Sequence, residues 1–452
     1  MSETASSRQQ RKHLHFDALV QLARQRFEQV PDQRRCPAFP LPDALMAGLA
    51  LFALKDPSLL AFARRTLDHN LRWVFGLRAI PSDTQMRQIL DEVDPAFVRP
   101  LFQDVFRQLQ RGKVLEDYVF LQGCYLVALD GVEYFCSQKV HCDHCLRRQH
   151  HNGDVSYYHQ MLGAVIVHPD FPEVIPLAPE SIQRHDGQHK NDCERNAARR
   201  WLQRFRQDHP HLPIIVVEDA LSSNAPHIRD LRAAGCHFIL AVKEGDHQHL
   251  FEQFRRRLEA DEVEIVEDVD ASTGLTHGYV FANGLTLNES NQGVEVNFLQ
   301  YLEMHDDGQE RQWTFVVDLE LTEANVRLVG RGGRTRWRIE NETFNTLKNQ
   351  GYHFEHNYGH GYQNLCTVFA LLMMAAFLID QVQQKCNGLF RAAWQKKGPK
   401  CALWEAVRQL FASFEVTSMA EVYAGIAYGF KRPSLKVLIE QAPGGPEGDD
   451  TS

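Results

Sequence analysis

The spacing of apolar and polar residues divides the chain into stretches of different character. From residue 13 to about 120, apolar residues recur every three or four positions, as in HFDALVQLARQRF and FVRPLFQDVFRQLQ. This period predicts amphipathic helices. A similar helical pattern resumes with WRIENETFNTLK and continues to about residue 437.

Between these helical stretches, short apolar runs alternate with helical segments. The runs YLVALDG, VSYYHQMLGAVIVH, EVIPLAPESI, LPIIVVED and CHFILAVK predict strands, and DCERNAARRWLQRFRQ and NAPHIRDLRAAG predict helices. Strands alternating with helices after an antiparallel start indicate a mixed α/β sheet covered on both faces. From 246 to 325 the pattern is rich in strands and turns, which predicts a small antiparallel insertion.

These changes of pattern predict five regions. They are a helical N-terminal region (1–116), a first part of an α/β core (117–245), the β-rich insertion (246–325), a second part of that core (326–390), and a helical C-terminal region with a disordered tail (391–452).

Length and composition point to a globular protein of two or three domains. The chain has 452 residues, of which 44% are hydrophobic and 24% charged, and one core rarely extends over such a length. Its 49 Lys and Arg against 58 Asp and Glu give a net charge of −9. A protein that only coats nucleic acid is usually basic, so the positions of the cations matter more than their number.

Targeting and redox signals indicate a soluble cytoplasmic protein. No apolar segment follows the N-terminal charges, so we expect no secretory signal. The run LCTVFALLMMAAFLI (365–379) is shorter than the ~20 residues of a membrane span, and we expect a helix buried inside the protein. The ten cysteines are then expected to be reduced thiols or metal ligands.

Two aspartates follow buried-strand patterns. Asp130 ends the run LVAL, and Asp219 follows IIVV and one glutamate. A carboxylate near a sheet interior is costly unless it is paired or holds a metal, and the ends of central strands are where α/β proteins place their sites. Taken singly, Asp130 before Gly131 also fits a turn, and Asp219 also fits a helix N-cap.

Glu340 is the third acid of interest. In an α-helix of about 3.6 residues per turn, Phe344 and Leu347 share its face, which predicts that Glu340 lies on the stripe facing the core. Glu342 is roughly 200° away and is expected to meet solvent.

Cations surround Glu340. Arg336 and Lys348, together with Trp337, lie within roughly 80° of it on the predicted helix. Arg binds phosphate in bidentate fashion and Lys acts as a point charge. The preceding GRGGRTR offers backbone N–H groups for phosphate contact, or its glycines form a turn.

Three carboxylates from two strands and a helix can hold two Mg²⁺ or Mn²⁺ ions. Such a pair, roughly 3.5–4 Å apart, activates a nucleophilic oxygen and stabilises the leaving oxygen in phosphodiester chemistry. These hard cations prefer oxygen ligands.

The segments ALDG, VVEDALSSN and RWRIENETFNTLK resemble those of the DDE transposases of bacterial insertion sequences, which have a ribonuclease-H-like catalytic core. The β-rich insertion before the third acid is similar to that of the subgroup with the signature Tyr-x2-Arg-x3-Glu-x6-Lys. The resemblance covers roughly residues 117–380. It implies that the core formed by 117–245 and 326–390 is catalytic and that the N-terminal region, 1–116, is a candidate for DNA binding.

The resemblance implies that Asp130, Asp219 and Glu340 form the catalytic, metal-binding triad. It also implies that Arg336 and Lys348, with their neighbours Trp337 and Arg338, contact DNA. Gly333 stands where the signature has tyrosine, and Lys348 lies one residue later than the signature lysine.

Other acids fit structural roles. Asp192 and Glu194 open a predicted helix, where the helix dipole favours acids, and Asp318 in FVVDLEL alternates with apolar residues as a strand residue does.

A cluster of cysteines and histidines lies in FCSQKVHCDHCLRRQHHNG. Cys142 and Cys145 form a Cys-x2-Cys pair, half of a zinc site, and Cys136 with His150 or His151 would complete it. The alternative is a polar loop beside DNA.

The predicted function is DNA transposition, in which a metal-dependent enzyme hydrolyses DNA at the element ends and the freed 3′-OH attacks target DNA. The resemblance also implies a homodimer on paired double-stranded ends. Two alternatives are a nuclease of the same fold without strand transfer and a non-catalytic DNA-binding protein descended from a transposase.

Overall fold

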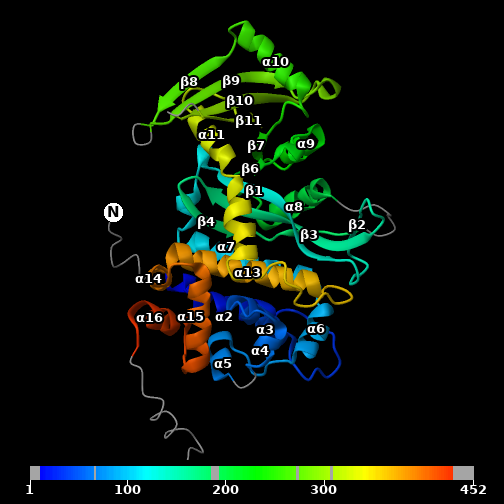
Figure 1. Cartoon of the computed structure of the whole chain (residues 1–452), viewed down its shortest axis with the longest axis vertical. Helices are drawn as coiled ribbons and strands as arrows, with labels where there is room; N and C mark the ends of the chain where they lie inside the picture. The colour runs from blue at the N-terminus through cyan, green and yellow to red at the C-terminus, as the bar shows by residue number, and fades with distance from the viewer. Residues whose placement is uncertain (1–10, 66–67, 185–192, 271–273, 306–308, 431–452) are drawn as a thin grey trace, which may run out of the picture.

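The computed structural model describes residues 11–65, 68–184, 193–270, 274–305 and 309–430 (Figure 1). A mixed sheet occupies the upper and middle parts of the molecule in this view, and helices from both ends of the chain form the lower part. The predicted disordered tail lies outside the described residues.

The sheet has 11 strands in the order β2-β3-β1-β6-β7-β11-β10-β9-β8, with β4 and β5 also paired to β3. Its strands are β1 (Tyr125–Ser137), β2 (Leu146–Gln149), β3 (Val155–His168), β4 (Phe171–Pro176), β5 (Glu180–Ile182), β6 (Ile214–Glu218), β7 (His237–Ala241), β8 (Glu264–Val269), β9 (Thr276–Thr286), β10 (Glu295–Met304) and β11 (Glu310–Val317).

Strand directions follow the predicted fold class. β1 pairs antiparallel with β3 and parallel with β6, and β6 pairs parallel with β7. The continuous apolar run at the start of β1 and all of β6 are buried, as parallel strands covered on both faces require. The predicted ribonuclease-H-like mixed sheet flanked by helices is confirmed.

Two predicted elements differ in detail. EVIPLAPESI forms two strands, β4 and β5, because Pro176 and Pro179 have no N–H to donate to a ladder. The β-rich insertion also contains a helix, α10 (Gln248–Glu259), which packs Phe254 against Phe298 of β10. Its strands continue the central sheet, because β11 pairs antiparallel with β7.

The other helices of at least five residues are α2 (Phe16–Phe27), α3 (Leu41–Ala53), α4 (Leu59–Ala63), α5 (His69–Phe75), α6 (Asp83–Asp91), α7 (Pro100–Arg111), α8 (Glu194–Asp208), α9 (Ala225–Ala233), α11 (Val326–Arg334), α12 (Asn345–Asn349), α13 (Leu365–Cys386), α14 (Gly388–Lys397), α15 (Lys400–Ser413) and α16 (Met419–Tyr428). α8 and α9 cover one face of the sheet, and α11 with the segment that follows it covers the other (Figure 1).

The apolar run at 365–379 forms most of α13, which crosses the middle of the molecule (Figure 1). Among the described helices it alone is long and apolar enough to cross a membrane, and 94% of its most apolar window is buried inside the protein. The prediction of a buried core helix is confirmed.

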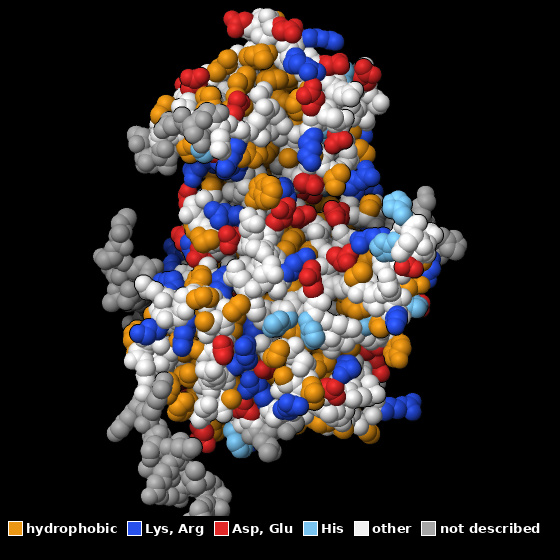
Figure 2. Space-filling view, viewed as in Figure 1, with side chains coloured by type: hydrophobic (Ala, Val, Ile, Leu, Met, Phe, Trp, Pro, Cys, Tyr) orange, Lys and Arg blue, Asp and Glu red, His pale blue; other side chains and the backbone are white. Residues whose placement is uncertain are grey.

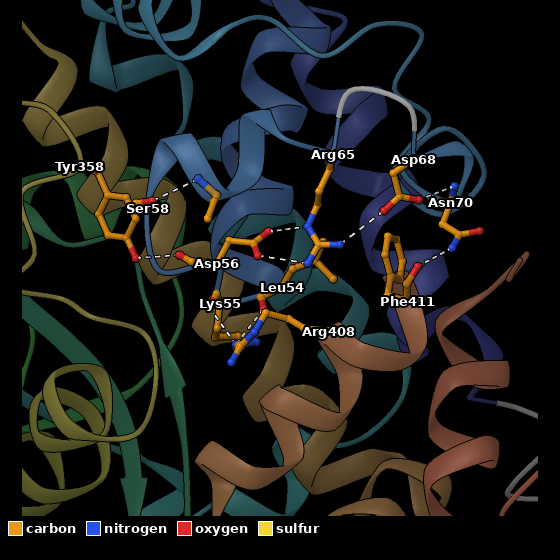
Figure 3. Close-up of polar contacts among 11 residues, drawn as sticks. Leu54, Lys55, Asp56, Ser58, Arg65, Asp68, Asn70, Tyr358, Arg408 and Phe411 are labelled. Carbon is orange, nitrogen blue, oxygen red and sulfur yellow. Dashed lines mark hydrogen bonds and ion pairs between the residues drawn. The ribbon is translucent and has the colours of Figure 1, made fainter. Parts of the chain in front are cut away.

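The two ends of the chain form one helical layer around α13. Figure 3 shows Arg408 of α15 donating to the carbonyls of Leu54 and Lys55, which follow α3. Asn70 of α5 donates to the carbonyl of Phe411, and Lys55 forms a buried ion pair with Asp380 of α13.

Candidate functional site

Asp130 and Asp219 lie toward the same end of two neighbouring central strands. β1 and β6 are parallel and in register, with Ala128 opposite Val217, and each aspartate is two residues beyond its paired residue. Asp219 follows the last residue of β6 and caps the next turn, because its Oδ1 accepts a hydrogen bond from the backbone N–H of Leu221 at 3.0 Å. The pairing of the two apolar runs thus brings both acids to the same end of the sheet.

Glu340 reaches this point from the helical segment that follows α11. Phe344, one turn beyond Glu340, packs its ring on Gly163 of β3, where a Cβ would lie 2.7 Å from the ring. Gly163 is the β3 partner of Asp130. The absence of a side chain at Gly163 therefore lets the glutamate segment approach the strand pair that holds Asp130.

The local conformation around Glu340 differs from the prediction. Residues Ile339–Phe344 form a π-helical turn, η7, between α11 and α12, and not a regular α-helix. Glu340 and Glu342 are both half-buried, and Glu342 lines the cavity beside this segment. Single π-turns of this kind are frequent at functional sites.

Arg336 connects the acids. Its Nη1 donates to Glu340 Oε1 at 2.5 Å and lies 3.9 Å from Asp130 Oδ2. The guanidinium side chain is only 14% exposed, so its charge acts in a poorly solvated environment. Arg336 therefore lies within the acidic cluster.

Burial raises the pKa of Asp130 to about 7. Arg336 opposes this rise, whereas the negative charges of Glu340 and Glu194 add to it. The backbone N–H of Gly131 donates to Asp130 Oδ1 at 2.9 Å. A carboxylate that burial and like charges destabilise in this way is stabilised by a further cation.

Glu194 also belongs to the acidic cluster, although the sequence predicts it only as a first-turn acid favoured by the helix dipole. It is the first residue of α8, accepts a hydrogen bond from Gln160 Nε2 at 2.8 Å, and lies against the backbone of Gly131. Burial and the charge of Asp219 raise its pKa. No local signal distinguishes it from an ordinary first-turn acid, and the other candidate there, Asp192, lies outside the described residues.

The donor set suits a hard divalent cation. Figure 2 shows acidic side chains gathered at mid-height on the face that carries β1, β6 and α11. All the candidate ligands are carboxylate oxygens, which Mg²⁺ and Mn²⁺ prefer, and the raised pKa of Asp130 indicates a need for positive charge. The ligand chemistry of Asp130, Asp219 and Glu340 therefore suits the predicted metal, although their oxygens converge less closely than the ligand atoms of the cysteine–histidine cluster described below.

The other predicted DNA contacts surround a second feature, a cavity of about 340 Å³ beside the glutamate segment. Trp337, which is 51% exposed, and Arg338 line it together with Arg331 and Arg334. Arg338 donates to the carbonyl of Pro169 at 2.9 Å. This side of the segment carries three arginines and an exposed aromatic ring, and Arg331 and Arg334 are ion-paired with Asp170 and Glu303.

Lys348 lies on α12, beyond η7. Its Nζ is 2.7 Å from Glu355 Oε1, and its side chain is 32% exposed. The structure thus places Lys348 in an ion pair with Glu355, away from the ion pairs of Arg336.

The glycines of GRGGRTR belong to α11 and form neither a turn nor a phosphate loop. A Cβ at Gly333 would lie 2.6 Å from the ring of Phe315, and one at Gly332 would lie 3.1 Å from Ile239. The glycines therefore let the helix lie close to the sheet. The same contact explains why position 333 has no tyrosine, since the Phe315 ring fills that space.

Asp318 is a satisfied residue at a strand end, as predicted. It accepts hydrogen bonds from the backbone N–H of Phe238 and contacts the ring of His237. These interactions hold the junction between β11 and β7.

The cysteine–histidine cluster has a different composition from the predicted one. Cys142 and Cys145 lie with His159 and His360, whose ligand atoms are all within 4.8 Å of one another. Cys136 is exposed on β1. The fourth predicted ligand, His150, contacts Ser156 Oγ through its Nε2. The reason is topological, because β3 and the segment before α13 bring distant histidines to the Cys-x2-Cys turn.

The sequence matches a known protein family. Residues 148–378, just over half of the chain, match the family described as the transposase DDE domain; this range contains Asp219 and Glu340, and Asp130 precedes it. No curated protein matches the sequence. Among solved structures, the piggyBac transposase in a synaptic complex with hairpin DNA is similar with a TM-score of 0.39 and 10% identity, over 94% of this chain and 82% of that chain. The chain belongs to the DDE transposase family.

Proposed function

We propose that this transposase cleaves the ends of a DNA element in a metal-dependent reaction and joins the freed 3′-OH ends to target DNA. The observation that supports the proposal is the ion pairing of Arg336 with both Asp130 and Glu340, where Asp130 lies on a strand whose parallel neighbour leads to Asp219 at the same end of the sheet.

Asp130, Asp219 and Glu340 would hold two Mg²⁺ or Mn²⁺ ions, which when bound activate the attacking oxygen and stabilise the leaving oxygen of a phosphodiester. Arg336 orients the Glu340 carboxylate toward Asp130, and its buried charge limits repulsion between these acids. Glu194 adds negative charge beside Asp130 and Asp219, which strengthens attraction for cations.

Double-stranded DNA would approach the face shown in Figure 2. Arg331, Arg334 and Arg338 line the cavity next to the acids and supply charge for phosphates. The exposed ring of Trp337 offers a surface on which a base freed from the duplex can stack. A pair of chains on paired ends follows from the family resemblance.

The test is a cleavage and strand-transfer assay with Mg²⁺ or Mn²⁺, using DNA that carries the inverted repeats flanking the gene. Asp130→Ala, Asp219→Ala and Glu340→Gln should each abolish joined product. Glu267→Gln, on an exposed position of β8, is the matched control and should retain full activity.

Full activity of any one of the three variants would refute the triad. Cleavage without joined product in the wild type would indicate a nuclease without strand transfer. Specific DNA binding without any cleavage would indicate a non-catalytic DNA-binding protein.

A further inference from the structure

A second cluster of ligand-type side chains lies away from the carboxylates. Cys142 and Cys145 come from the turn between β1 and β2, His159 from β3, and His360 from the segment between α12 and α13. We propose that these four residues bind a structural Zn²⁺ that clamps the chain following Glu340 to the strand pair carrying Asp130. The zinc site rests on its own geometry, and its role in the active site rests on the proposed function.

The distances match a tetrahedral site. With Zn–S bonds of ~2.3 Å and Zn–N bonds of ~2.0 Å, ligand atoms lie about 3.8 Å apart for two sulfurs, about 3.5 Å for sulfur and nitrogen, and about 3.3 Å for two nitrogens. Here the two sulfurs are 3.9 Å apart and the two Nε2 atoms 3.1 Å. The measured sulfur–nitrogen distances are 3.5, 3.4 and 3.2 Å.

The histidines are oriented as metal ligands are. His360 Nδ1 lies 2.8 Å from the carbonyl oxygen of Gly361, an acceptor for its N–H, so the lone pair of Nε2 faces the cluster. Such a hydrogen bond from the other ring nitrogen is typical of zinc-bound histidine. The ring of His159 stacks at 24° on Tyr134 and directs Nε2 at both cysteine sulfurs, whereas its buried Nδ1 has no hydrogen-bond partner among the described residues.

Burial favours a metal over a polar loop. Cys145 is 1% exposed, His159 2% and His360 5%, and the ring of Phe135 packs against both histidines. Four polar ligand atoms converging in a nearly water-free site need a common partner. Zn²⁺ binding would convert the two thiols to thiolates and release their protons, leaving a neutral Cys2His2 centre.

The clamp closes a long loop. Cys145 and His360 are 215 residues apart in sequence, and linking such distant positions reduces the conformational entropy of the unfolded chain. β1 carries Asp130 and leads directly to the cysteines, while His360 follows the Glu340 segment. A bound ion would therefore fix the segment of Glu340 relative to Asp130.

The first test is the metal content of the full chain, purified without chelator. We expect about one zinc per chain, and after exchange for Co²⁺ the thiolate-to-cobalt absorption and visible bands of a tetrahedral site. Absence of zinc together with absence of these bands would overturn the proposal, as would a Cys142–Cys145 disulfide in the protein as purified.

Variants test the ligand set. Cys142→Ser and His360→Ala should lose most of the zinc, whereas Cys136→Ser, a cysteine of the same region outside the cluster, should retain it. Equal zinc loss in Cys136→Ser would overturn the assignment. Zinc content is measured independently of transposition, so a zinc-loaded wild type without strand transfer would refute the proposed function and leave the site intact.

Discussion

Asp130 should destabilise the metal-free protein at neutral and alkaline pH. Burial raises its pKa in the folded state to about 7 from the ordinary value of 3.8. The folded protein therefore binds this proton more tightly than the unfolded chain, and stability is lost as the pH rises from about 3.8 to about 7. Replacing the Asp130 carboxylate by an amide, in Asp130→Asn, removes this loss of stability with rising pH.

The magnitude follows from the shift. From pH 5 to about pH 7 Asp130 is protonated in the folded state and ionised in the unfolded state, so the free energy of unfolding falls with each pH unit. Over these roughly two units, at 1.36 kcal/mol per unit, the fall between pH 5 and pH 8 is about 2.7 kcal/mol. Unfolding a chain of 452 residues at ~2.1 cal/mol/K per residue gives an entropy of about 0.95 kcal/mol/K. The Tm advantage of Asp130→Asn over the wild type should thus grow by about 3 °C across this interval.

The assay is differential scanning fluorimetry in EDTA at pH 5 and pH 8, with Glu267→Gln as the control whose Tm difference should not depend on pH. Adding Mg²⁺ at pH 8 should raise the Tm of the wild type more than that of Asp130→Asn, because the ion offsets the buried charge. A Tm difference between Asp130→Asn and wild type that is the same at both pH values would refute the assigned pKa and the reasoning behind it.

Three further changes test the surroundings of the site. Glu194→Gln should lower the pKa of Asp130 by removing a neighbouring negative charge, so the Tm of the metal-free protein should begin to fall at lower pH. An unchanged dependence of Tm on pH would contradict the effect of Glu194 on Asp130. Arg336→Ala should reduce strand transfer about 10²-fold or more, with partial recovery in Arg336→Lys, which keeps the charge without the forked geometry. Gly333→Ala should lower stability in urea unfolding by about 1–3 kcal/mol through overpacking, and a second change, Phe315→Leu, should restore most of it.

Much of the fold was predictable because strands of a buried parallel sheet have continuous apolar sequences. The runs before Asp130 and Asp219 defined both strands, and their register followed once they paired. The π-turn around Glu340 was not predicted, because it leaves no trace in a periodicity of 3.6 residues. The prediction for the helix around it otherwise placed Phe344 correctly in the core.

The remaining site residues depend on tertiary contacts that no local pattern encodes. Glu194 approaches Asp130 only because α8 docks with its first turn beside β1. His159 and His360 are brought to the cysteines by the pairing of β3 and by the segment before α13. The sequence predicts Cys136 and His150 as the remaining zinc ligands because they are near Cys142 and Cys145 in sequence.

The layer shared by the two ends of the chain governs when the protein can fold during synthesis. Lys55 pairs with Asp380, 325 residues later, and at roughly 5–20 residues per second the ribosome needs about 15–65 s to make the partner. Until then α3 has no α13 against which to pack its apolar surface. A chain that terminates before α13 leaves the surface of α3 that packs on α13 without its partner.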